Sequence, residues 1–279
     1  MRQLAEVLRL STGYLQDHGS ATPRLDAELL IGHALGLERI ALYTGFDRPL
    51  TEPELAACRA LLERRGRREP VAYIIGRCGF HDLDLAVDAR VLVPRPETEV
   101  LVERCLALLG DGAPGVLDVG TGSGAIALAI KAARPDAHVT ATDVSADALA
   151  VAGANAAALG LEVELLESDL LAGVAGRRFD LIASNPPYIA EADMETLEPE
   201  VARFEPRLAT VAGASGTEVL DRLIATAPDA LVEGGWLVVE CGAGQASRVQ
   251  EAMAAAGGRE VFGERDLAGI ERVVGGRWG

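Results

Sequence analysis

The residues best suited to chemistry in this chain are four neighbours, Asn185, Pro186, Pro187 and Tyr188, which follow the apolar run of residues 179–183. That run predicts a buried strand. Proline fixes its own φ angle and pushes the preceding residue out of the helical region, so the strand must end in a rigid extended stub. A chain that only turns would more often use Gly, Asn or Asp. We therefore interpret the stub as a device that holds a carboxamide, a carbonyl and an aromatic ring still.

A second group of candidate residues forms a glycine-rich turn after the predicted strand 116–119. Such glycines let a ligand lie against the backbone at a helix N-terminus. Asp143 ends the next predicted strand, and its carboxylate can accept hydrogen bonds from both ribose hydroxyls of a nucleotide. The spacing G-x-G-x-G departs from the dinucleotide fingerprint G-x-G-x-x-G, which argues against an NAD enzyme. The residues of this turn are Gly120, Thr121, Gly122, Ser123 and Gly124.

Four successive predicted strands each carry one polar residue at or just after their C-terminal ends. These residues are Asp118, Asp143, Asp169 and Asn185. Open α/β sheets bind their ligands at the carboxyl edge of the strands. A single Asp in such a place is often a solvated turn or a helix cap, but the repeated arrangement favours a shared site.

The elements that must position these residues fall into three parts. Residues 1–75 have helical spacing and predict a small helical domain, with a capping box at residues 51–54. Residues 76–93 alternate apolar and polar positions and predict a β-hairpin connector. Residues 94–279 alternate strands with helices, which predicts an α/β domain with a seven-stranded, mostly parallel, Rossmann-like sheet covered on both faces.

Composition limits the classes of function. The formal net charge of −16 opposes loose binding to phosphate backbones, so direct nucleic-acid binding is not expected. The N-terminus is too polar for a signal peptide, and no apolar run approaches the ~20 residues that span a bilayer, so we expect a cytoplasmic protein with no membrane partner. No metal site or disulfide is expected either, because the cysteines are scattered without a CxxC pair: Cys58, Cys78, Cys105 and Cys241.

The glycine turn, Asp143 and the NPPY tetrapeptide together resemble the amino-methylating branch of class I S-adenosylmethionine-dependent methyltransferases. The resemblance implies S-adenosylmethionine as cofactor and S-adenosylhomocysteine as product. The glycine turn would hold the amino-acid end of the cofactor and Asp143 its ribose, while Asp169 and Leu170 would border the adenine. Relatives often place an aromatic residue at the last of these positions, so Leu170 would offer apolar packing only.

In such an enzyme the NPPY residues would present a planar NH2 group to the activated methyl. The side-chain oxygen of Asn185 and the carbonyl of Pro186 would each accept one N–H, and Tyr188 would stack on the face of the group. We expect acceleration from orientation and electrostatics rather than proton abstraction, since the motif contains no strong base.

The remaining motifs resemble the peptide chain release factor N5-glutamine methyltransferase family. The residues that carry this likeness are the stretch 94–99 (PRPETE), residues 205–209, Glu240, Gly242, Gln245 and residues 266–274. The resemblance implies methylation of the glutamine in the Gly-Gly-Gln loop of class 1 release factors, by a monomer whose helical domain recognises the substrate.

NPPY alone does not distinguish a glutamine amide from an adenine or cytosine amine. Two alternatives therefore stay open: a ribosomal-protein glutamine methyltransferase, and a DNA or RNA amino methyltransferase. The second would need a basic recognition face, which the charge balance opposes.

Overall fold

A computed structural model describes residues 2–279 of the chain. The chain divides into two compact units. The first contains residues 2–77 and 198–204, and the second contains residues 78–197 and 205–279. Each unit has a hydrophobic core of its own.

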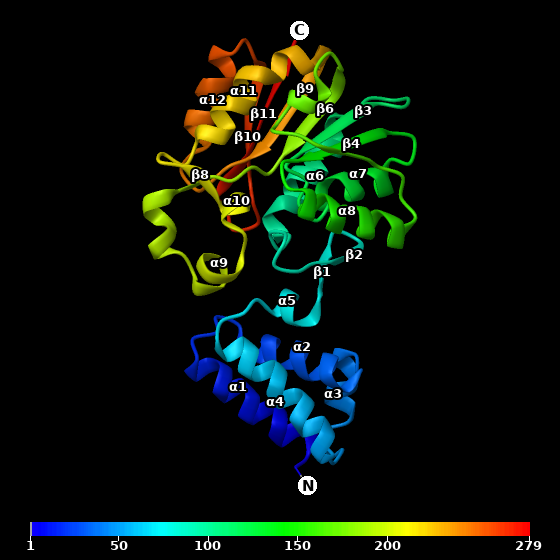
Figure 1. The fold of residues 1–279 in the computed structure, drawn as a ribbon, viewed down its shortest axis with the longest axis vertical. Coiled ribbons are helices and arrows are strands. Elements are labelled where there is room, and N and C mark those ends of the chain that lie inside the picture. Colours follow the sequence, from blue (N-terminus) through cyan, green and yellow to red (C-terminus); the bar gives the residue numbers. More distant parts are fainter. Residues whose placement is uncertain (1) are drawn as a thin grey trace. The chain divides into compact units, whose positions relative to one another are not determined.

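The first unit is helical, and its residues 2–77 are drawn in blue and cyan in Figure 1. Its core is built by α1, α2 and α4 from residues such as Leu4 and Leu15, Leu30, and Cys58, and amphipathic spacing explains the buried face of α1. The expected capping box begins α4, where the Glu54 backbone N–H donates to Thr51 Oγ1 and the Glu54 carboxylate accepts from the Thr51 N–H. The helices are α1 (Leu4–Asp17), α2 (Pro23–Leu35), α3 (Arg39–Thr44), α4 (Glu52–Gly66) and α5 (Val71–Ile75).

The short helix α9 (Pro199–Phe204) belongs to this helical unit although it lies far along the chain. Arg65 is buried and donates from Nε to Asp26 at 2.7 Å and from an Nη to Glu200 of α9 at 2.7 Å. Arg68 adds a second pair of hydrogen bonds to the Glu200 carboxylate. The sequence analysis assigns no helix here, and these ion pairs hold α9 in the helical unit.

The second unit begins with the hairpin β1 (Arg77–Phe80) and β2 (Leu83–Ala86), which lies within the predicted connector 76–93. The helix α6 (Pro96–Leu108) follows and leads into the central sheet. The sheet has seven strands in the order β10-β11-β9-β6-β3-β4-β5. Neighbours pair in parallel from β5 to β9, and β11 is antiparallel to both β9 and β10. The predicted seven-stranded, mostly parallel sheet is confirmed.

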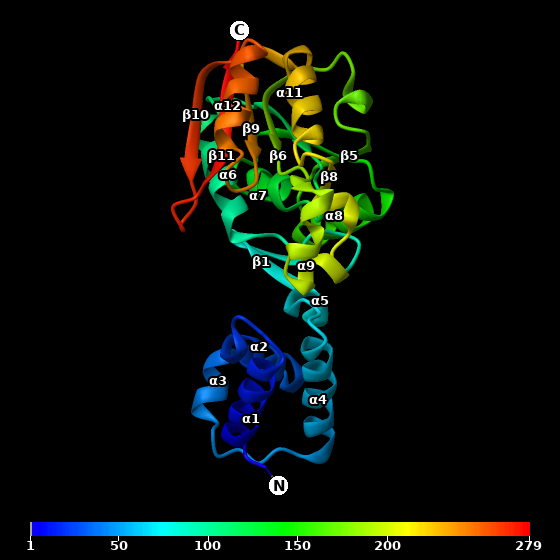
Figure 2. The same ribbon diagram turned by 90° about the vertical axis from the view of Figure 1, so that its left-hand side faces the viewer.

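Helices cover both faces of this sheet (Figures 1 and 2). Successive side chains of a strand point to opposite faces, so Val116 joins the core under α6 and α7, whereas Leu117 joins the core under α11 and α12. The strands are β3 (Gly115–Val119), β4 (His138–Asp143), β5 (Glu164–Glu167), β6 (Phe179–Ser184), β9 (Leu231–Glu240), β10 (Arg259–Arg265) and β11 (Glu271–Trp278). The helices are α7 (Ala125–Ala133), α8 (Ala146–Leu159), α11 (Glu218–Ala230) and α12 (Ala246–Ala255).

The segment between β6 and α11 contains short elements that the sequence did not predict. A two-stranded parallel ribbon joins β7 (Ile189–Ala190) to β8 (Val211–Gly213). The helix α10 (Arg207–Thr210) precedes β8. Among residues 2–279, no helix is both long and apolar enough to cross a bilayer.

Candidate active site

A cavity of about 360 Å³ lies in the second unit, and its wall includes residues at the carboxyl ends of the parallel strands. In the sheet, β4 and β5 lie on one side of β3, whereas β6 and β9 lie on its other side. Such a reversal of strand order leaves a crevice where open α/β sheets bind ligands. The sequence-predicted residues in the wall are Gly120, Thr121, Gly122, Ser123, Asp143, Asp169, Leu170, Asn185, Pro186 and Pro187.

The glycine turn forms one side of this cavity because its backbone is left-handed. Gly120 has φ +74° and Gly122 has φ +56°, and a Cβ added at either would meet no atom within 4 Å. The glycines are therefore needed for their conformation, and they leave open backbone facing free space. Gly124, with φ +86°, sets the start of α7 but does not line the cavity.

Asp143 lies at the end of β4, and about half of the hydrogen-bond acceptor positions of its carboxylate are occupied. Its Oδ2 accepts the Gly122 N–H at 2.9 Å, and its Oδ1 accepts the Ser145 N–H at 2.9 Å. An ionised carboxylate offers about four acceptor positions, so about two remain for a ligand. The residue thus braces the glycine turn and can still accept from a pair of hydroxyls.

Asp118 lies behind the glycine turn and does not line the cavity. Its Oδ2 accepts from Thr121 Oγ1 at 2.6 Å and from the Ala127 N–H at 3.1 Å, whereas its buried Oδ1 has no hydrogen-bond partner among residues 2–279. Burial raises the pKa of this carboxyl to about 7, and the two hydrogen bonds oppose the rise. In this geometry Asp118 ties β3 to the turn and to α7.

Asp169 and Leu170 lie on another wall of the cavity. An Nη of Arg222, from α11, donates to Asp169 Oδ2 at 2.7 Å, and both side chains are well exposed. Leu170 has φ +50°, a conformation that costs a non-glycine residue free energy and tends to occur at functional sites. Arg222 was not predicted as a site residue from the sequence, because nothing in α11 signals a pairing across the cavity.

Asn185 follows β6, and its carboxamide is held by a chain of hydrogen bonds. Its Nδ2 donates to Thr98 Oγ1 at 3.0 Å, and Thr98 Oγ1 donates to Glu240 Oε2 at 2.6 Å. Thr98 and Glu240 are both buried. Burial raises the pKa of Glu240, and the hydrogen bond from Thr98 opposes that rise. Asn185 Oδ1 has no hydrogen-bond partner within residues 2–279 and remains available as an acceptor.

Tyr188 differs from the other NPPY residues because it does not line the cavity. Its ring packs against the core under α11 and α12, and its hydroxyl donates to Glu240 Oε1 at 3.5 Å. Burial, with Glu240 nearby, raises the pKa of Tyr188 to about 12, so the phenol stays neutral. Its backbone carbonyl accepts from Gln245 Nε2 at 3.0 Å. In this structure the ring supports the loop rather than forming a wall of the cavity.

Arg95 and Glu205 join two of the motifs noted in the sequence. One Nη of Arg95 donates to both oxygens of the buried Glu205, at 2.6 and 2.8 Å. Arg95 also lines the cavity together with Thr98. The stretch 94–99 therefore forms part of the site, although the sequence left the roles of its charged residues open and did not single out Thr98.

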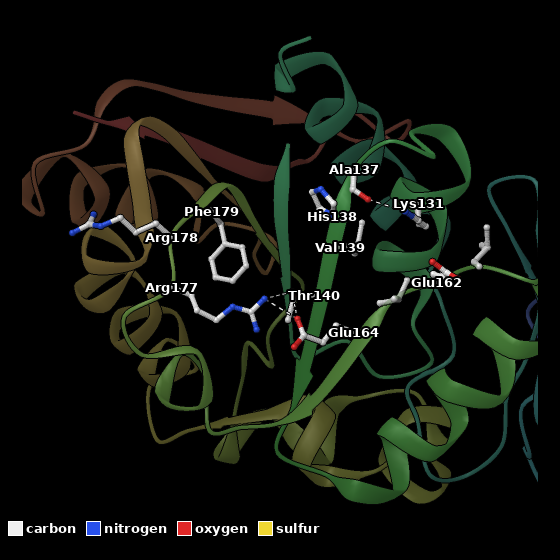
Figure 3. A pocket seen from close by; sticks show the side chains of 12 residues that line it. Lys131, Ala137, His138, Val139, Thr140, Glu162, Glu164, Arg177, Arg178 and Phe179 are labelled. Carbon is white, nitrogen blue, oxygen red and sulfur yellow. Dashed lines mark hydrogen bonds and ion pairs between the residues drawn. The ribbon is translucent and has the colours of Figure 1, made fainter. Parts of the chain in front are cut away.

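A second cavity, of about 660 Å³, lies near the start of β4 and β5 (Figure 3). Its cations are already engaged. Lys131 donates to the carbonyls of residues 135 and 137, Arg177 pairs with Glu164 and bonds Thr140, and Arg178 donates to the carbonyl of Leu231. It is remote from the carboxyl edge, so we assign the candidate active site to the first cavity.

The fold and the glycine-turn cavity define an α/β domain of the methyltransferase class. A solved structure of a methyltransferase from Pyrococcus furiosus shares this fold with a TM-score of 0.55, at 20% identity over 78% of this chain and 98% of that chain. Residues 97–201 match the methyltransferase small domain, and residues 6–76 match the PrmC N-terminal domain.

Relatives define the family more narrowly. The release factor glutamine methyltransferase of Geobacter sulfurreducens is 45% identical over 276 residues, covering 99% of this chain and 97% of the relative. That of Rhodopirellula baltica is 43% identical over 278 residues, covering 96% and 94%. The chain belongs to the release factor glutamine methyltransferase family, as the sequence resemblance predicted.

Proposed function

We propose that the chain transfers a methyl group from S-adenosylmethionine to the side-chain amide nitrogen of the glutamine in the Gly-Gly-Gln motif of class 1 release factors. The products are N5-methylglutamine and S-adenosylhomocysteine. The observation that carries the proposal is that the likeness to release factor glutamine methyltransferases covers 99% of the chain, and so includes the helical unit as well as the catalytic one.

The lining of the cavity fits this cofactor. The bare backbone at Gly120 and Gly122 accommodates its amino-acid end, and the spare acceptor positions of Asp143 suit its ribose hydroxyls. The wall of the cavity also carries apolar side chains that suit an adenine: Ile126, Val144, Leu170 and Leu208. When bound, the cofactor supplies an electrophilic methyl group on a sulfonium, and the protein has only to place the acceptor nitrogen.

Asn185 is placed to orient that nitrogen. Conjugation delocalises the lone pair of an amide nitrogen, so its NH2 must be held in one orientation. Asn185 Oδ1 accepts one N–H, and the carbonyl of Pro186 accepts the other. These two acceptors stabilise the positive charge that develops on the nitrogen during transfer, and the proton leaves afterwards. Pro186 and Pro187 hold both acceptors still because their φ angles are fixed.

The remaining assignments belong to the same proposal. The helical unit recognises the release factor, and Gly124 and Asp118 support the cofactor site from behind the turn. The enzyme works as a cytoplasmic monomer without a metal. No cluster of three or more metal-ligating side chains occurs within residues 2–279.

Label transfer tests the substrate. The protein is incubated with methyl-labelled S-adenosylmethionine and, in separate reactions, a class 1 release factor, the same factor with its Gly-Gly-Gln glutamine changed to alanine, a ribosomal protein, and DNA or RNA. We expect label on the unmodified release factor only. Label on nucleic acid or ribosomal protein and none on the release factor would overturn the assignment.

A further inference from the structure

We propose that Thr98 and Glu240 are positioning residues that determine which end of the Asn185 carboxamide faces the substrate. The inference rests on the proposed function and deepens it. It starts from the order of donors and acceptors in the chain Glu240–Thr98–Asn185, in which hydrogen bonds of 2.6 and 3.0 Å join the three side chains and both supporting residues are buried.

The direction of the chain follows from hydrogen-bond chemistry. Oε2 of Glu240 accepts the hydroxyl proton of Thr98 at 2.6 Å. A hydroxyl has one proton, so the remaining capacity of Thr98 Oγ1 toward Asn185 is as an acceptor. Only the Nδ2 end of Asn185 can donate to it, and the two atoms lie 3.0 Å apart. The Oδ1 end of Asn185 is thereby left for the substrate.

This orientation matters because a carboxamide has two ends of similar shape and opposite polarity. With Oδ1 toward the substrate, Asn185 accepts from the NH2 group of a glutamine. With the ends exchanged, its NH2 would meet the substrate NH2, and two donors would face each other. A free side chain would populate both arrangements, whereas the buried chain of hydrogen bonds selects the productive one.

The three residues come from three elements that pack together. Thr98 is in the first turn of α6, Glu240 ends β9, and Asn185 follows β6, while α6 packs against both β9 and β6. Tyr188 contributes a weaker bond to the second oxygen of Glu240. The orientation of Asn185 is therefore set by the packing of the domain and does not depend on a bound ligand.

The test compares Thr98→Val, which keeps the shape and loses the hydroxyl, with Thr98→Ser, which keeps the hydroxyl. The matched control is Thr140→Val. Thr140 is also buried and has the same double role, donating to Glu164 at 2.9 Å and accepting from Arg177 at 2.8 Å, but it lies at the second cavity (Figure 3). The control therefore reports the general effect of removing a buried hydroxyl from this domain.

We expect Thr98→Val to lower kcat for release factor methylation by roughly 10- to 100-fold, the scale of effect that misplacement of a reacting group produces. The KM for the release factor and the Kd for the cofactor should change by less than about threefold, because the lost bonds act on orientation rather than on binding. Thr98→Ser should restore most of kcat, and Thr140→Val should leave it unchanged. Equal losses in Thr98→Val and Thr140→Val, or no loss in Thr98→Val, would overturn the proposal.

A second readout needs no substrate and so separates this inference from the proposed function. In a ¹⁵N-labelled protein, the side-chain NH2 of Asn185 can be assigned by comparison with Asn185→Ala. We expect one of its protons to exchange slowly with solvent in the wild type and in Thr98→Ser, and rapidly in Thr98→Val. Rapid exchange in the wild type would refute the orienting chain, whatever the substrate is. A slow proton in a protein that does not methylate the release factor would refute the proposed function alone.

Discussion

Changing Asp143 to asparagine should weaken cofactor binding by an amount that the structure bounds. The carboxylate accepts one backbone N–H on each oxygen, from Gly122 and Ser145, and keeps about two acceptor positions for the ribose. Asparagine has a single acceptor oxygen, so its NH2 end must face one of these backbone donors. It can no longer serve both ribose hydroxyls.

At least one hydrogen bond from the ribose to a charged acceptor is lost in this variant. Such a bond contributes about 1.5–3 kcal/mol. The Kd for the cofactor should therefore rise by roughly 10- to 150-fold, since 1.4 kcal/mol corresponds to a factor of ten. The turn at Gly122 also loses a partner in one of the two side-chain orientations, so the melting temperature should fall slightly.

Isothermal titration with S-adenosylhomocysteine measures this affinity without any protein substrate. Asp136→Asn is the matched control, because Asp136 is a half-exposed carboxylate paired with Arg134 and does not line the cavity. It should bind within about twofold of the wild type, as expected for a surface ion pair. If Asp143→Asn also bound the cofactor within threefold of the wild type, the assignment of the ribose site would be wrong.

Three further predictions concern other parts of the protein. Asn185→Ala should lower methyl transfer to the release factor by about 100-fold or more, as loss of one preorganised polar group does elsewhere, with cofactor affinity unchanged by titration; full activity would exclude the clamp. In the folded state Asp118 keeps its proton up to about pH 7, whereas in the unfolded chain it releases the proton near pH 4. The folded state therefore becomes less stable as the pH rises through this window. Asp118→Asn should accordingly melt roughly 2–4 °C higher than the wild type at pH 8 and show no such gain at pH 4, where the native carboxyl is already protonated. Arg65→Met leaves Asp26 and Glu200 without their shared cation and should destabilise the helical unit by about 3–5 kcal/mol in denaturant unfolding, whereas a loss below 1 kcal/mol would show that the ion pairs contribute little.

The sequence by itself determined the features that depend on neighbouring residues. The capping box at Thr51 and Glu54, the alternation of strands and helices, and the left-handed glycines at 120 and 122 all follow from rules that act within a few residues. The carboxyl-edge rule then placed Asp143, Asp169 and Asn185 in the wall of one cavity.

Only the tertiary structure decided which groups meet across elements. The helix α9 and the β7–β8 ribbon have no signal in the sequence, because elements this short are stabilised by distant partners such as Arg65 rather than by their own residues. Tyr188 is predicted to stack on the substrate, and only the tertiary structure shows that its ring also packs against the core under α11 and α12.

The chain of hydrogen bonds at Asn185 likewise depends on residues that are distant in the sequence. It joins residues 87 and 142 positions apart, and no local pattern of residue types encodes a hydrogen bond between a helix and the ends of two strands. The sequence alone shows which residue types can accept hydrogen bonds from an amide. The direction in which Asn185 presents its oxygen is set by Thr98 and Glu240, because folding buries them in a chain of hydrogen bonds that ends at its carboxamide.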